Sequence, residues 1–78
     1  METITAAARI LADLRRVSSS PAILWHNIPR AKRAAAFRLL SKLGLIEVAF
    51  VAGSTKNWRL SERGRAVGVG EEFSALVR

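Results

Sequence analysis

The sequence predicts a small, mostly helical α+β domain in which three helices are followed by a two-stranded β-hairpin and a C-terminal helix. Two observations predict it. Apolar residues recur with a helical period up to residue 43, and after Gly44 the chain becomes β-branched and aromatic with no such period. A chain of this length buries only about 60% of the surface that it exposes when unfolded. We therefore expect one domain, 1–78, with its core over about residues 3–68.

Composition excludes several classes of protein. The chain has no cysteine, which excludes disulfides and thiolate metal sites. The longest stretch without a charged residue, 17–29, is 13 residues long and too short to cross a bilayer as a helix. Residues 1–3 lack the basic region and the apolar block of a signal peptide. We expect a cytoplasmic protein with no membrane partner.

Helices are expected at both ends of the chain. Residues 3–16 carry one apolar stripe with helical spacing, formed by Ile4, Ala7, Ala8, Leu11 and Leu14. Near the other end, Ser61 can cap a helix that starts at Glu62, and Gly68 and Gly70 should end or kink this helix. The last eight residues are expected to form a short terminal helix.

A second, short helix is expected to follow the first. Ser20 is a favourable N-cap, and Pro21 suits the first helical position, whose amide has no partner. Pro29 disfavours helical geometry at the residue before it, so this helix is limited to about residues 22–27. Trp25 lies on it and is expected in the core or at an interface.

The third helix is expected over residues 30–43, which contain no internal glycine or proline. With Leu40 at the centre of the buried stripe, a rotation of 100° per residue brings Ala36, Phe37 and Leu43 within about 60° of it. The residues that then face outward are Ala31, Ala34, Ala35, Arg38 and Lys42. Gly44 suits the left-handed conformation that commonly ends a helix.

A β-hairpin is expected after this glycine. Residues 45–52 are rich in strand-forming side chains, residues 53–57 form a turn-rich and flexible tip, and residues 58–60 return as the second strand. Trp58 and Leu60 alternate onto one strand face, which favours the core for both side chains over a stacking surface for bases.

The positive charge of the chain is concentrated in its middle. The whole chain carries thirteen Lys and Arg residues against six Asp and Glu, a net charge of +7. Residues 29–59 hold seven of the basic residues and a single acidic one, Glu47, for a net charge of +6. A coat of charge that serves only solubility would be spread evenly. The asymmetry favours a localised face that binds anions, with nucleic acid as the first candidate.

The sequence offers little support for an enzyme. With no cysteine, one histidine and one aspartate, it assembles no nucleophile and base pair and no metal cluster, and His26 is expected to be a surface or core residue. The glycines at 64, 68 and 70 do not follow a strand in the arrangement that holds a nucleotide. We expect no catalytic residues, no cofactor and no metal, and the sequence identifies no small-molecule ligand.

Two short motifs carry a resemblance to a known fold. Leu43-Gly44-Leu45-Ile46 closes the third helix, and Leu60-Ser61-Glu62-Arg63-Gly64-Arg65 follows the hairpin. Over residues 20–68 the chain resembles the winged helix-turn-helix regulators of the MarR, PadR and ArsR-like type in bacteria and archaea, in which these motifs flank the wing. The order of helices and hairpin is also that of a winged helix.

The resemblance implies sequence-selective binding of double-stranded DNA by a small transcriptional regulator. Residues 30–43 would be the recognition helix in the major groove, and residues 46–60 the wing on the backbone or in the minor groove. The candidate DNA-binding residues are Arg30, Lys32, Arg33, Arg38, Lys42 and Lys56. Among them, Arg33 points within about 20° of the buried stripe, so it is expected either to pair internally or to lie past the edge of the core.

Two alternatives to DNA binding stay open. The first is a winged helix used for protein interaction or assembly, because Ala49 and Val51 would expose an apolar strand face to a partner. RNA binding is the second. We also expect a homodimer built from the first helix and residues 69–78. The apolar residues outside the minimal core, which would need cover, are Ile10, Val17, Phe73, Leu76 and Val77.

Overall fold

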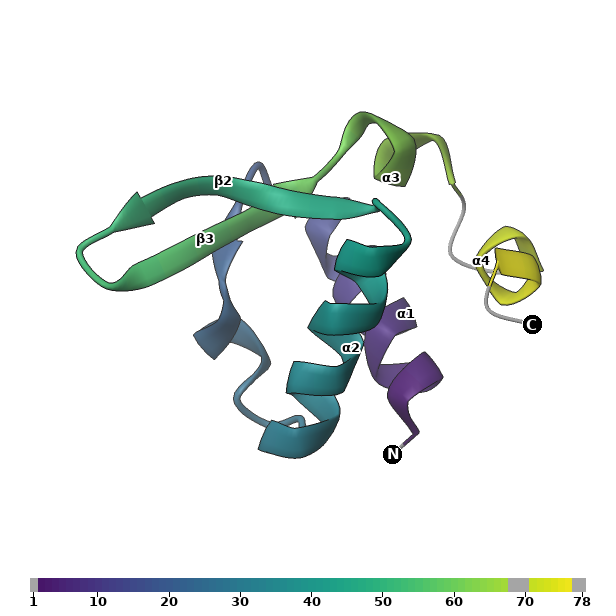
Figure 1. Cartoon of the computed structure of the whole chain (residues 1–78), viewed down its shortest axis with the longest axis horizontal. Helices are drawn as coiled ribbons and strands as arrows, with labels where there is room; N and C mark the ends of the chain where they lie inside the picture. Colours follow the sequence, from purple (N-terminus) through teal and green to yellow (C-terminus); the bar gives the residue numbers. More distant parts are fainter. Residues whose placement is uncertain (1, 68–70, 77–78) are drawn as a thin grey trace.

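Helices and a small antiparallel sheet form the domain that the computed structural model shows in Figure 1, and the structure describes residues 2–67 and 71–76. The elements in chain order are α1 (Thr3–Leu14), β1 (Ser20–Pro21), the 3-10 helix η1 (Ala22–Trp25), α2 (Arg30–Lys42), β2 (Ile46–Ala52), β3 (Thr55–Leu60), α3 (Glu62–Ala66) and α4 (Glu71–Leu76). The expected α+β class is confirmed, and the arrangement is compatible with a winged helix.

One buried cluster of apolar side chains joins the helices to the sheet. It is formed by Ala6, Ala7, Ile10, Leu11, Leu14, Trp25, Ile28, Ala36, Phe37, Leu40, Leu45, Ile46, Leu60 and Phe73. Trp25 is its largest member and is fully buried, as expected. Trp58 is half-buried and packs against the cluster from β3, which agrees with the core position predicted for it.

The buried stripe of α1 differs from the expected one. Ile4 is exposed and Ala8 only half-buried, whereas Ala6 and Ile10 are fully buried. The stripe is therefore rotated, because α1 packs against α2 on one side while the core also contains Phe73 from α4. Sequence periodicity alone cannot give this rotation, since it depends on which elements surround the helix.

The prediction of a helix beginning at Pro21 was wrong. Ser20 and Pro21 form the short strand β1, which pairs with Trp58 and Asn57 of β3, so Ser20 caps no helix. The sheet consequently has three strands in the order β1-β3-β2 rather than two. Proline is acceptable here because β1 is an edge strand. Only the 3-10 helix η1 fits between this strand and Pro29.

The hairpin has a longer second strand and a shorter turn than expected. Strand β3 starts at Thr55, so only Gly53 and Ser54 form the turn, and Lys56 lies in a strand opposite Val51 rather than in a flexible tip. Gly53 has a φ of 63°, and no non-glycine residue has a positive φ in the described part of the chain. This pattern, with glycine first, is that of a type II′ hairpin turn.

The end of α2 follows its prediction closely. Gly44 has a φ of 72°, and its amide donates to the carbonyl of Ser41. The amide of Leu45 donates to the carbonyl of Leu40, and both leucines are fully buried. These two hydrogen bonds and the apolar pair form a Schellman motif, which satisfies the last carbonyls of the helix.

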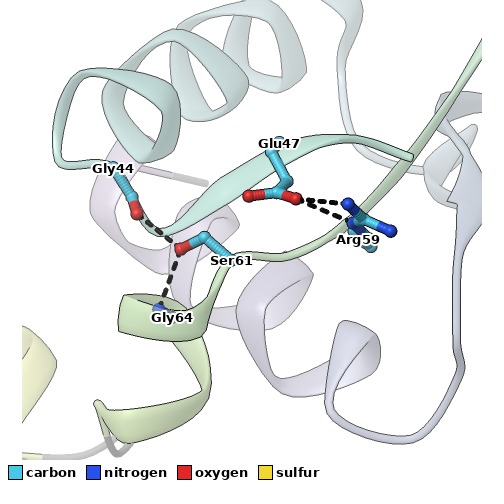
Figure 2. Close-up of polar contacts among 5 residues, drawn as sticks. All are labelled: Gly44, Glu47, Arg59, Ser61 and Gly64. Carbon is cyan, nitrogen blue, oxygen red and sulfur yellow. Dashed lines mark hydrogen bonds and ion pairs between the residues drawn. The ribbon is translucent and has the colours of Figure 1, made fainter. Parts of the chain in front are cut away.

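A junction between the end of α2 and the start of α3 closes the base of the hairpin. Figure 2 shows the Ser61 hydroxyl donating to the Gly44 carbonyl at 2.5 Å and accepting from the Gly64 amide at 3.0 Å, which confirms the predicted cap. The Ser61 amide also donates to the Leu45 carbonyl at 3.0 Å. A Cβ atom on Gly64 would lie 2.0 Å from that carbonyl oxygen, so only glycine fits.

The C-terminal helix is present as α4 within the expected last eight residues, and Phe73 is buried in the core. The expected break at Gly68 and Gly70, and the expected helical state of residues 77–78, lie outside the described residues. Of the helices that the structure describes, none is both long enough and apolar enough to cross a membrane.

The junction generates a test in which two physical effects have opposite signs. Helix propensity alone predicts that Gly64→Ala stabilises α3 by about 1 kcal/mol. The clash with the Leu45 carbonyl predicts instead that the free energy of unfolding falls by about 1–3 kcal/mol. Urea denaturation followed by far-UV circular dichroism measures the sign. The control is the exposed neighbour Arg63→Ala, expected to change stability by less than about 0.5 kcal/mol. A stabilised Gly64→Ala protein would contradict the crowded junction.

Candidate nucleic-acid interface

Basic side chains cover the exposed side of α2. Arg30, Lys32, Arg38 and Lys42 are all exposed, and we call this set the α2 basic face. At 100° per residue, Arg38 and Lys42 lie within about 40° of each other on the side opposite the buried stripe, with Arg30 and Lys32 flanking them. Helix α2 contains no acidic residue, so no carboxylate on the helix itself neutralises this face.

Aromatic packing determines which side of α2 faces outward. The ring of Phe37 lies between two tryptophans, with its centroid 5.6 Å from that of Trp25 and 5.1 Å from that of Trp58. Such pairs add about 0.5–1.5 kcal/mol each to the burial of their apolar area. Ala36 and Leu40 are fully buried beside Phe37. The rotation of α2 is therefore fixed by contacts with η1 and β3, and the basic residues are left outside.

Arg33 is not part of this face. It is half-buried, and its Nη1 donates to the carbonyl of Trp25 at 3.1 Å. The indole Nε1 of Trp25 in turn donates to Oδ2 of Asp13 at 2.7 Å. Of the two positions expected for Arg33, the internal one is observed. Its guanidinium joins α2 to η1, and the Trp25–Asp13 bond joins η1 to α1.

Lys56 is exposed but belongs to a different element from the other candidates. It lies in β3 next to the turn of the hairpin, and Figure 1 shows this turn projecting far from α2. Its neighbours on the hairpin include two exposed apolar residues, Phe50 at 52% and Val51 at 57%. A bulge between Val48 and Phe50 changes the register of β2, which leaves Ala49 half-buried rather than exposed as expected.

Another basic region was missed by the sequence analysis. Arg15, Arg16, Arg59 and Arg65 line one open cleft, although they come from three separate places along the chain. Arg59 is ion-paired with Glu47, its partner across the β2–β3 ladder, at 2.7 Å (Figure 2). No local pattern predicts this gathering, because it exists only after α1, β3 and α3 have packed together.

Groups suited to catalysis or to metal binding are dispersed. Across the residues that the structure describes, no three His, Cys, Asp or Glu side chains come together as metal ligands would. His26 is exposed, with its Nδ1 3.2 Å from the Ile23 carbonyl, and Asp13 is occupied by the indole of Trp25. The charged groups that gather on the described surface are guanidinium and ammonium groups, which are able to bind anions.

Comparisons with known proteins give no family. No protein-family model matches the chain, and searches of curated proteins and of solved structures find no match either.

Proposed function

We propose that the protein binds double-stranded DNA with sequence selectivity and acts as a small transcriptional regulator of the winged-helix type. The α2 basic face, on a helix without a single acidic residue, is the observation that carries this proposal. Helix α2 would enter the major groove as the recognition helix, and the β2–β3 hairpin would lie as the wing against the backbone or in the minor groove.

The dimensions and composition of α2 support insertion into a groove. Its 13 residues make a helix about 20 Å long, and the major groove of about 12 Å admits one helix. Ala31 and Ala34 are exposed beside the basic residues, and their small side chains permit close approach to bases. Arg38 lies mid-helix, where a guanidinium can bond bidentately to guanine O6 and N7.

The N-terminal turn of α2 supports a phosphate contact. The residue before the helix is Pro29, and none of the described side chains caps the helix start. The first amides are therefore available to an anion, and the helix dipole favours negative charge at this end. Arg30 and Lys32 lie in the same turn and add two positive charges.

Exposed apolar residues favour a second candidate function, protein interaction without DNA binding. The large side chains concerned are Ile23, Leu24, Val48, Phe50 and Val51. Strand β2 is also an edge strand, to which another chain could add. In that case the basic residues would serve only solubility, and duplex DNA would not bind at physiological salt.

The first prediction concerns salt. If Arg30, Lys32, Arg38, Lys42 and Lys56 neutralise about five phosphates, log K falls with log salt at a slope of about −4 to −5. Fluorescence anisotropy with a labelled random duplex between about 50 and 200 mM salt measures it, with single-stranded DNA and RNA as competitors. Lys42→Ala should reduce the slope by about 1, whereas Arg63→Ala on α3 should leave it unchanged. If the affinity for duplex DNA does not change with salt concentration, the result argues against DNA binding and favours the protein-interaction function.

The second prediction separates base contacts from backbone contacts. Arg38→Ala should cost about 1–3 kcal/mol of binding free energy and relax sequence preference, because a base contact is lost. Lys56→Ala on the hairpin should weaken binding to all duplexes alike. Both variants are measured against a duplex selected from a random pool and against the unselected pool. If Arg38→Ala weakens both duplexes by the same factor, Arg38 reads no base.

We also predict a homodimer, although fewer exposed apolar residues support it than the sequence suggested. Ile10 and Phe73 are buried within the single chain at 0% and 1% exposure, so the expectation that they need cover from a partner was wrong. Leu76 is half-buried against the core, and Val77 lies outside the described residues. Val17 remains exposed and could be covered by a second copy of the chain. Two-fold pairing of two chains would set their recognition helices about 34 Å apart, the spacing of successive major grooves. Sedimentation equilibrium should give about twice the 8.5 kDa of the chain. A mass of 8.5 kDa at micromolar concentration would exclude the dimer.

A further inference from the structure

An open cleft of about 530 Å³ lies where the end of α1, the residues after it, β3 and α3 meet. Its lining residues are Leu14, Arg15, Arg16, Val17, Ser18, Arg59, Leu60 and Arg65. None of them belongs to α2 or to the hairpin turn. Figure 1 shows α3 at the opposite end of the hairpin from that turn. The cleft is thus a separate feature from the α2 basic face.

The cleft has an unbalanced positive charge. Half of its lining residues are arginines, and no Asp or Glu occurs among the lining residues that the structure describes. Glu47 pairs with Arg59, whose Nε and Nη2 lie 2.8 and 2.7 Å from Oε2, so this guanidinium is largely compensated. Arg15, Arg16 and Arg65 carry the excess. Like charges gathered at one place repel one another, and an anion bound between them removes that cost.

Two of the walls are held in place by the fold. The Nη1 of Arg15 donates to the Val67 carbonyl at 2.6 Å, which ties the end of α1 to the end of α3 and leaves most of the guanidinium donors unused by this bond. Leu14 and Leu60 lie behind the cleft and are almost fully buried, so Val17, at 44% exposure, is the aliphatic lining side chain that a ligand can reach. The hydroxyl of Ser18 supplies one more polar group.

We propose that this cleft binds a small phosphorylated ligand of the nucleoside polyphosphate class. The arginines would hold the phosphates through charge-assisted hydrogen bonds, and the exposed side chain of Val17 would contact the base. The volume lies within the range of about 300–1,000 Å³ that is usual for small-ligand sites. A DNA backbone presents the same phosphate chemistry, but the cleft contains no residue of α2 or of the hairpin turn, which favours a free ligand. The proposal does not depend on DNA binding by α2.

Isothermal titration calorimetry of the full chain with adenosine triphosphate tests the proposal, with inorganic triphosphate and adenosine as comparison ligands. One saturable site per chain is expected for adenosine triphosphate, weaker binding for inorganic triphosphate, and none for adenosine alone. The double variant Arg16→Gln/Arg65→Gln should weaken adenosine triphosphate by about tenfold or more, because two charge-assisted contacts are lost. Neither side chain makes a hydrogen bond in the described part of the chain, so the variant should fold, which circular dichroism checks.

The matched control is Arg30→Gln/Lys32→Gln, which removes the same charge from the α2 basic face. It should change adenosine triphosphate affinity by less than about twofold, because its residues lie outside the cleft. Equal weakening by the two double variants would overturn the proposal, since binding would then follow net charge alone. Absence of saturable binding to the wild-type protein would overturn it as well.

A duplex DNA arm separates the two sources of phosphate. If Arg16→Gln/Arg65→Gln weakens duplex binding by the same factor as the α2 control while adenosine triphosphate does not bind, the cleft is a backbone contact and the ligand proposal fails. If adenosine triphosphate binds through the cleft and the wild-type protein binds no duplex, the DNA-binding proposal fails and the ligand site stands. The two proposals can therefore be refuted independently.

Discussion

The close approach of α3 to the end of α2 is the constraint on which the position of the hairpin depends. Gly64 lies against the Leu45 carbonyl with no room for a Cβ atom, and Ser61 bonds to Gly44, Leu45 and Gly64 at once. These contacts hold the start of β2 and the end of β3 together, and they therefore fix the direction in which the hairpin projects from the helices. In the proposed binding mode, this junction would hold α2 and the hairpin in one relative position against a duplex.

The rotation of α2 is the second constraint. It places one arginine of this helix against η1 and leaves another exposed to solvent. Phe37 packs between Trp25 and Trp58, so the side of α2 that carries Arg33 turns toward η1. There the guanidinium satisfies a backbone carbonyl, and a hydrogen bond to a charged donor contributes about 1.5–3 kcal/mol. Arg38, five residues further on, lies on the exposed side. Two arginines with the same charge therefore differ in role: Arg33 stabilises the packing of α2 against η1, whereas Arg38 is exposed and available for binding.

Two basic surfaces emerge from one net charge of +7. The α2 basic face is carried by a helix, a shape that fits a groove, whereas the arginine cleft is an open hollow lined by four arginines, a shape that fits a compact anion. The ion pair with Glu47 at the base of the hairpin compensates the charge of Arg59, one of the four lining arginines. Arg15, Arg16 and Arg65 have no such carboxylate among the lining residues that the structure describes, and this is why we propose an anion as the ligand of the cleft.

The sequence by itself determined the features that depend on neighbouring residues. The bounds of α2 were predicted to within one residue, and the left-handed Gly44 and the Ser61 cap were predicted correctly, because helix propensity and capping act within one turn. Tertiary structure decided the pairing of Ser20 with Trp58, the inward turn of Arg33 and the gathering of the arginines in the cleft. Each of these joins separate elements of the fold, and for Ser20 and the cleft the partners are far apart in sequence. Their free energy comes from packing and hydrogen bonds that form only when the whole chain has folded.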